Sequence, residues 1–170
     1  MAEFGWAVLC TRAIIDRLNN QLSMIDAADV LWVAGPSIEN ELATALKEGH
    51  EGIRVPVKLT LVAWWYRSDY AVGESVNCRF SLIDPRGKTA LTTPYSVDLT
   101  SGTGGRQFMA FENFPVTSFG LYRFVTEKEV VRDGGQTVWE VVSNLPLDVR
   151  LRPSTEQAPP SELPQPSASS

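Results

Sequence analysis

Hydrophobic and polar positions alternate along most of the chain with a period of two residues. The clearest case spans residues 74–82, and the same alternation recurs over 57–65 and 147–152. In the first of these segments the apolar positions are Val76, Cys78, Phe80 and Leu82. A period of two is typical of a β-strand that buries one face. The pattern therefore predicts a chain that folds mainly as strands.

Further strands are predicted on both sides of these segments. Residues 6–15 and 21–25 flank Asn19-Asn20, which is typical of a hairpin tip. Shorter or weaker strand patterns fall at 29–33, 93–99, 107–111, 122–124 and 139–141. Eight or nine antiparallel strands at this short spacing predict an all-β fold, an immunoglobulin-like β-sandwich.

One segment departs from the strand pattern and predicts a helix over residues 36–47. Ile38, Leu42 and Leu46 recur every four residues, which places them on one face of a helix. Ser37 is positioned to cap the segment, and acidic residues occupy its first turn. We expect a short amphipathic helix that crosses one end of the sandwich.

The composition changes abruptly at Pro153. From there to Ser170 the chain contains five Pro, five Ser and no aromatic residue. Such a segment cannot bury enough apolar surface to offset the entropy of ordering. The sequence thus predicts a β-sandwich domain over 1–152 and a disordered Pro/Ser-rich tail over 153–170.

The order of features resembles a family of uncharacterised bacterial proteins. The resemblance rests on the segment Ala7-Val8-Leu9-Cys10, the hairpin that leads into residues 21–27, and the hydrophobic strand that opens at Pro56. Members of that family often begin with a Leu-Cys-Asp-like strand followed by a Gly-Lys-Leu-x-Leu-like hairpin. Here Thr11 stands in place of the Asp and Asn20 in place of the Gly. The family has no assigned activity, so the resemblance implies a fold and leaves function open.

Charge narrows the partners that we expect. The 170 residues carry a net charge of −5, with no run of more than two basic residues. Affinity for nucleic acid and for anionic membranes depends on clustered Lys and Arg, so neither partner is predicted. The N-terminal segment has an acid where a signal peptide has basic residues, which favours a cytoplasmic protein.

Candidate catalytic chemistry is sparse. His50 is the only histidine, and it lies in a polar, glycine-flanked segment that predicts an exposed loop. Cys10 and Cys78 lie in apolar strand patterns and are expected to be buried free thiols. Residues 100–106 are glycine-rich but lack the Lys-Ser/Thr ending of a phosphate-binding loop. We therefore expect no enzyme activity, no cofactor and no metal.

The most distinctive candidate site is aromatic and includes Trp64, Tyr66, Arg67 and Tyr70. Adjacent strand residues face opposite sides, so the alternation predicts Trp65 inward and Trp64 outward. Trp, Tyr and Arg dominate protein-binding hot spots, which favours a non-catalytic interaction or scaffolding module with a protein partner; a second copy of the chain is one candidate for that partner. One alternative is that the helix over 36–47 covers Trp64. Another is a ligand- or carbohydrate-binding sandwich that uses exposed aromatics.

Overall fold

A computed structural model describes residues 2–35, 37–69 and 71–152 of the chain; the predicted tail at 153–170 lies outside the described residues. The described residues form nine strands and one helix. The bounds are β1 Ala2–Ile15, β2 Leu22–Ala27, β3 Val30–Val33, α1 Ile38–Lys47, β4 Ile53–Arg67, β5 Ser75–Ile83, β6 Thr89–Asp98, β7 Gly104–Val116, β8 Gly120–Val131 and β9 Thr137–Leu151.

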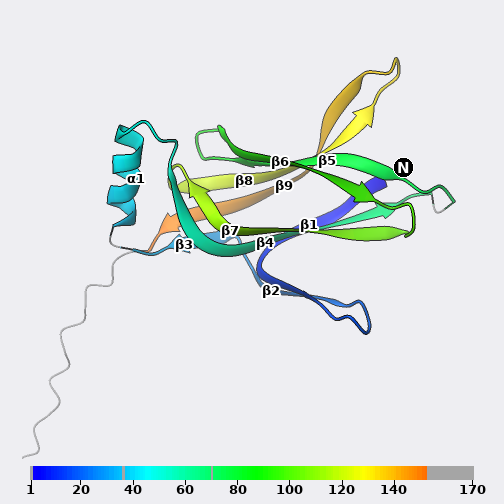
Figure 1. Cartoon of the computed structure of the whole chain (residues 1–170), viewed down its shortest axis with the longest axis horizontal. Coiled ribbons are helices and arrows are strands. Elements are labelled where there is room, and N and C mark those ends of the chain that lie inside the picture. The colour runs from blue at the N-terminus through cyan, green and yellow to red at the C-terminus, as the bar shows by residue number, and fades with distance from the viewer. Residues whose placement is uncertain (1, 36, 70, 153–170) are drawn as a thin grey trace, which may run out of the picture.

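The strands form two sheets that pack face to face, as predicted for an all-β sandwich (Figure 1). The four-stranded sheet has the order β2-β1-β4-β7, and the five-stranded sheet has the order β3-β9-β8-β5-β6. All strand pairs except one are antiparallel; β3 and β9 are parallel. The prediction of purely antiparallel strands was wrong at this pair. Alternation reports which face of a strand is buried, whereas the direction of its neighbour depends on where the chain crosses between the sheets.

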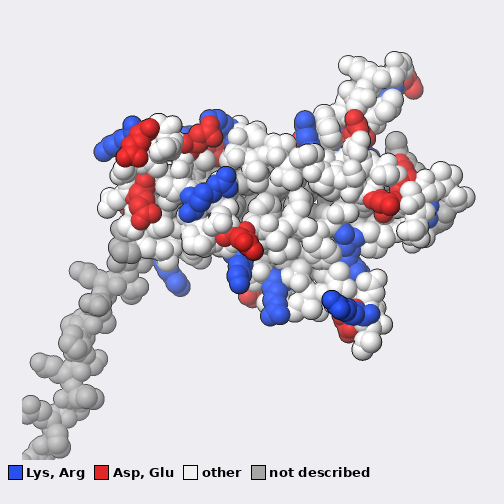
Figure 2. Space-filling model, in the orientation of Figure 1, with Lys and Arg blue, Asp and Glu red and all other residues white. Residues whose placement is uncertain are grey.

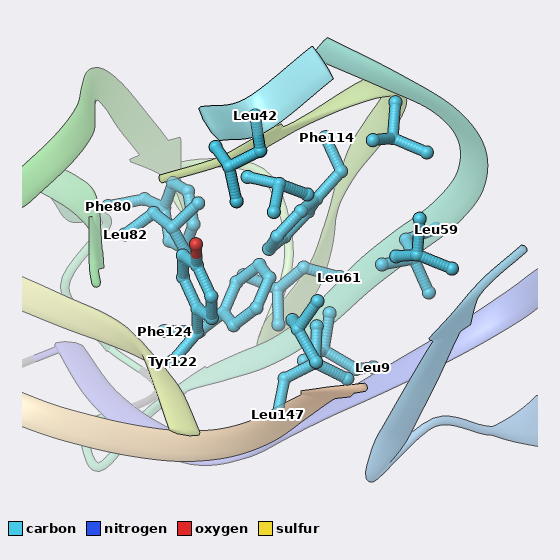
Figure 3. Close-up of a cluster of buried hydrophobic side chains, with 14 residues drawn as sticks. Leu9, Leu42, Leu59, Leu61, Phe80, Leu82, Phe114, Tyr122, Phe124 and Leu147 are labelled. Carbon is cyan, nitrogen blue, oxygen red and sulfur yellow. The ribbon is translucent and has the colours of Figure 1, made fainter. Parts of the chain in front are cut away.

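The inward faces of the two sheets form the core (Figure 3). Aromatic side chains at its centre pack edge to face or tilted, with ring centroids 5.4 Å apart for Phe80 and Phe124 and 5.2 Å apart for Phe114 and Tyr122. Such ring contacts add to the apolar burial that drives folding. A second cluster around Trp65 fills the other end of the sandwich, where Phe4 meets the Trp65 ring edge-on.

Helix α1 lies across one end of the sandwich, as the four-residue spacing predicted (Figure 1). Leu42 is buried in the core cluster, whereas Leu46 is exposed. Ser37 is the N-cap residue, but its side chain makes no capping hydrogen bond. The helix is therefore held to the sandwich mainly by the turn that contains Leu42.

The same end of the sandwich holds a buried polar network. The Asp84 carboxylate is buried in the turn after β5 and accepts hydrogen bonds from the Lys88 N–H (2.8 Å), the Thr117 hydroxyl (2.8 Å) and the Arg86 guanidinium (3.0 Å). Burial alone would raise the pKa of Asp84, but these bonds outweigh it and hold the pKa below its ordinary value. The Tyr122 hydroxyl accepts from the Thr117 N–H (2.8 Å) and so fastens the β7–β8 connection.

Strand β1 changes direction near its middle and leaves the sandwich as a two-stranded ribbon with β2 (Figure 1). We call residues 10–27 the ribbon. The Ala28 N–H donates to the Leu9 carbonyl at 2.8 Å, which closes the base of the ribbon. The β1–β2 ladder pairs Cys10 with Ala27 and resumes two residues further on, while Asp26 between these points has a left-handed φ of +52°. The predicted hairpin is therefore present, as an excursion from the sandwich.

Candidate functional site

The structure separates the predicted site residues onto two faces of β4. Trp65 is fully buried and Trp64 is half-buried on the opposite, outward side, as the alternation predicted. Arg67, which we had grouped with Trp64, is buried instead and donates to the Val72 carbonyl at 2.7 Å. The physical reason is the same alternation, since residues 65 and 67 share the inward face. Arg67 therefore supports the loop after β4 and does not belong to the outward surface.

Tyr66 lies on the outward side with Trp64. It is half-buried, and its hydroxyl donates to the Glu3 carboxylate at 3.1 Å. Tyr70 lies outside the described residues. Of the predicted group, the structure thus brings together Trp64 and Tyr66 on one outward surface.

The Trp64 ring lies in a space created by two glycines on the neighbouring strands. A Cβ at Gly5 on β1 or at Gly104 on β7 would come within 2.5 Å of the indole. The Arg106 guanidinium lies over the ring, with its central carbon 5.5 Å from the ring centroid. That side of the ring is consequently not open for a sugar to stack on. Helix α1 does not cover Trp64 either, because α1 packs beside Val55, nine residues earlier on β4.

The outward side of the four-stranded sheet is apolar over three neighbouring strands, in the order β1, β4, β7. The register aligns Trp6 with Trp64 and Arg106, and Val8 with Val62 and Phe108. We call this surface the apolar face; it comprises Trp6, Val8, Cys10, Val62, Trp64 and Phe108. Side chains on the outer face of a sheet normally contact water when nothing packs on that face. Val62 and Cys10 nevertheless are both 0% exposed. A further element must therefore cover the centre of this face.

The ribbon is that element. It turns back beneath the four-stranded sheet, and its tip returns towards the start of β7 (Figure 1). The Arg106 guanidinium donates to both the carbonyl and the side-chain oxygen of Asn20 at the tip, each at 3.0 Å. Asn20 has a left-handed φ of +55°, which suits Asn in a tight turn. Arg106 thus lies between the ribbon tip and the Trp64 ring.

The ribbon itself is apolar on both of its faces. Ile14 and Ile15 are sequence neighbours and so face opposite sides, and each is 38% exposed. Met24 and Ile25 repeat this arrangement on β2, at 39% and 40%. At the tip, Leu18 is 97% exposed. The face that carries Ile14 and Ile25 also carries the exposed Arg12 and Ser23, so apolar side chains are exposed on both faces of the ribbon beside polar ones.

These ribbon residues were not predicted as a site, although the sequence carries a signal for them. Two adjacent apolar residues in a hairpin strand, as in Ile14-Ile15 and Met24-Ile25, break the alternation of a half-buried strand. The pairs therefore indicate that both faces of the hairpin are apolar. In the register Ile14 lies opposite Ser23 and Ile25 lies opposite Arg12, so the two pairs are displaced from one another along the ribbon.

The outer face of the five-stranded sheet differs, because hydrogen-bonded ion pairs lie among its apolar residues, which include the exposed Leu121 and Val141. The Arg79 guanidinium donates two hydrogen bonds to the Glu127 carboxylate, at 2.6 and 2.8 Å, and lies over the Trp139 ring at 4.5 Å. Beside them, the Asn77 side chain donates to Glu129 at 2.7 Å and accepts from Ser96. We call this surface the polar face. Over the side of the molecule drawn in Figure 2, acidic and basic side chains are interspersed.

The single histidine and the two cysteines lie apart from the ion pairs and side-chain hydrogen bonds described for the two faces. His50 is exposed beside Glu48, as predicted. Cys10 and Cys78 are both buried and free, also as predicted. Burial raises the pKa of Cys10 and raises that of Cys78 to about 12, which keeps both thiols protonated near neutral pH.

Two searches of the described part of the chain complete the description of possible sites. Among residues 2–35, 37–69 and 71–152, no group of three or more His, Cys, Asp or Glu side chains is placed to hold a metal ion. Within the same ranges, no helix has the length and apolar character needed to cross a membrane.

Comparison with known proteins was made at the level of families and of individual curated sequences. No family model and no curated protein matches the chain.

Proposed function

We propose that this chain is a non-catalytic protein-interaction module and that the ribbon is the part that contacts the protein partner. The observation that carries the proposal is the half-exposure of apolar side chains on both faces of the ribbon, at Ile14, Ile15, Met24 and Ile25. A two-stranded ribbon is marginally stable alone in water. A contiguous exposed apolar surface on a folded protein marks a site of association. Binding of a partner to the ribbon buries the surface that the sandwich leaves open.

The margin of the apolar face supports the same surface. Trp6 on β1 and Phe108 on β7 are 37% and 40% exposed, and Arg106 lies between the ribbon tip and Trp64. Aromatic residues and Arg contribute most of the binding energy in typical interfaces. The ribbon and these three residues together present apolar and aromatic contacts beside the charged residues of the ribbon, which are Arg12, Asp16, Arg17 and Asp26.

The sandwich that supports the ribbon is proposed to be immunoglobulin-like. The strand orders β1-β4-β7 and β3-β9-β8-β5-β6, with chain crossings between the sheets, support this topology. So does Tyr122 at the start of β8, whose hydroxyl bonds back to the backbone of Thr117 and Ser118. Immunoglobulin-like domains carry a tyrosine with this role. We further propose that the chain is a cytoplasmic protein related to the uncharacterised bacterial family that its first strand and hairpin resemble.

Affinity capture with matched baits tests the proposed function. The full chain, a Leu18→Lys/Ile25→Lys variant and a Val131→Lys variant are each used to capture proteins from a lysate of the source cells, and the captured proteins are quantified by mass spectrometry. Val131 is an exposed apolar residue at the end of β8, in the β8–β9 hairpin, so its substitution controls for a general loss of surface hydrophobicity. We expect a partner that the full chain and Val131→Lys retain equally and that Leu18→Lys/Ile25→Lys loses at least tenfold.

A second bait separates loss of contact from loss of fold. Residues 11–26 are replaced by a two-residue Asn-Gly turn, which can join Cys10 to Ala27 because these residues pair across the ribbon. Circular dichroism confirms that the sandwich persists before capture. Retention of the same partner by this ribbon-less bait would disprove the proposed site.

A further inference from the structure

The four strands at the edges of the two sheets differ in how they are protected against pairing. An exposed edge presents unpaired backbone N–H and C=O groups, and natural edges are protected by short length, proline or charge. Strand β3 has only four residues, β6 contains Pro94, and β7 contains Glu112 and Pro115. Strand β2 has six residues, no proline and a single charged residue, Asp26, near its base. Of these four edges, β2 is therefore the one prepared for pairing.

We propose that β2 pairs with β2 of a second copy of the chain, antiparallel about a two-fold axis, so that the two ribbons join into one four-stranded sheet. This inference rests on the proposed function and names the partner of the ribbon. A strand edge that pairs with its own copy makes the same contacts from both sides, which is the isologous arrangement of a two-fold dimer.

The hydrogen-bond phase of the ribbon sets the position of the axis. The Asp16 N–H donates to the Gln21 carbonyl at 2.9 Å, and hydrogen-bonded pairs recur every second residue of an antiparallel ladder. Ser23 and Ile25 accordingly bond to β1, whereas Leu22 and Met24 direct their N–H and C=O groups to the free edge. An axis through Met24 places these outward groups of the two copies opposite one another.

Charge complementarity favours a second copy in this register. The base of the ribbon carries Arg12, Asp26 and Asp29, with a net charge of −1, whereas the tip carries Asp16, Arg17 and the Arg106 guanidinium bonded to Asn20, with a net charge of +1. Antiparallel pairing places the acidic base of one ribbon alongside the tip of the other, so that Arg17 of each copy approaches the acids of the second. The Asp26 residues of the two copies are four residues apart along the ladder, which is about 13 Å at the rise of a strand. The two Asp26 carboxylates are therefore not opposed.

Cysteine cross-linking tests both the partner and the register. In the proposed dimer Met24 faces Met24 of the second copy, about 5.5 Å away between Cα atoms, which is within reach of a disulfide. Residue 22 faces residue 26 of the second copy, so two cysteines at position 22 cannot meet. The native thiols are buried and do not compete. Under mild oxidation we expect Met24→Cys to form a covalent dimer at least tenfold faster than Leu22→Cys; equal rates, or no dimer from either variant, would overturn the register.

Sedimentation equilibrium of the full chain supplies the second readout. Proline at position 24 removes an N–H that points to the free edge, so Met24→Pro spares the β1–β2 ladder while blocking the pairing of two copies. We expect a dimer for the full chain. For Met24→Pro we expect the dissociation constant of the dimer to be at least tenfold larger. A chain that stays monomeric at every concentration overturns self-pairing. If that monomer still captures a ribbon-dependent partner, the proposed function stands without it; if it captures none, both fall.

Discussion

On the polar face, the side chains of the five-stranded sheet hydrogen-bond to one another, whereas on the apolar face the side chains of the four-stranded sheet lie beneath the ribbon. Arg79 and Glu127 illustrate the first arrangement, since each supplies the other's hydrogen bonds. Val62 illustrates the second, because it faces outward and is still fully buried. The difference shows that one outer face meets water as a single layer, while the other has a covering element whose own surface is left open.

The largest expected effect comes from placing a charge on each face. Val62→Lys buries an ammonium group without a partner, and we expect it to lower the free energy of unfolding by about 3–5 kcal/mol. Val125 is the matched position, outward and half-buried on β8 of the polar face. Val125→Lys should cost about 1 kcal/mol or less, the span of strand propensities. Urea unfolding of both variants measures the contrast, and equal losses would mean that the two faces are covered alike.

The next effect removes the central ion pair of the polar face. Arg79→Ala breaks two charge-assisted hydrogen bonds and leaves Trp139 without the guanidinium above it. Because Arg79 is partly exposed, we expect a loss of about 1–2 kcal/mol in the free energy of unfolding. The loss should shrink at high salt, which screens this pair. A loss that does not change with salt would mean that packing on Trp139, not the charge, stabilises this face.

A smaller effect loosens the cover of the apolar face. Arg106→Ala removes the two hydrogen bonds to Asn20, and we expect a loss of about 1 kcal/mol together with faster hydrogen exchange at the ribbon tip. Asn20→Gly is the matched control, since it keeps the carbonyl acceptor and tolerates the left-handed φ. It should leave exchange nearly unchanged. Equal acceleration in both variants would show that the Asn20 side chain alone holds the tip.

The smallest effect is a dependence on pH that belongs to neither face. The folded protein holds the pKa of Asp84 below its ordinary value, here 3.8, so Asp84 stabilises the fold fully above that value. This contribution is lost as the pH falls below 3.8 and through the lowered pKa. We expect Asp84→Asn to weaken the fall in the free energy of unfolding at acid pH. Arg106→Ala should keep the pH dependence of the unsubstituted protein. A parallel change in both variants would place the acid-sensitive group elsewhere.

Alternation along the chain was enough to predict the sandwich, the hairpin and the inward position of Trp65. It was not enough to predict the parallel β3–β9 pair, because the period of a strand carries no information on the direction of its neighbour. The helix was predicted from its four-residue spacing, yet only Leu42 is buried. Local spacing defines a face, while the depth of burial depends on what the fold places against that face.

The candidate site was predicted only in part. Trp64 follows directly from alternation, and Arg67 could have been assigned to the inward face by the same rule. The covering role of the ribbon could not be predicted, because it depends on a change of direction in β1 and on a contact between Arg106 and Asn20. These two residues are far apart in the sequence, and no local pattern links them.

The measurement that tests the account most directly is hydrogen exchange of the β2 backbone at two protein concentrations well apart. The N–H groups of Leu22 and Met24 point to the free edge of the ribbon, so in an isolated chain they exchange with solvent rapidly. We predict that these two amides become protected as concentration rises, while the amides of Ser23 and Ile25, already bonded to β1, change far less. Rapid exchange of Leu22 and Met24 at both concentrations would contradict the proposal that β2 pairs with a second copy.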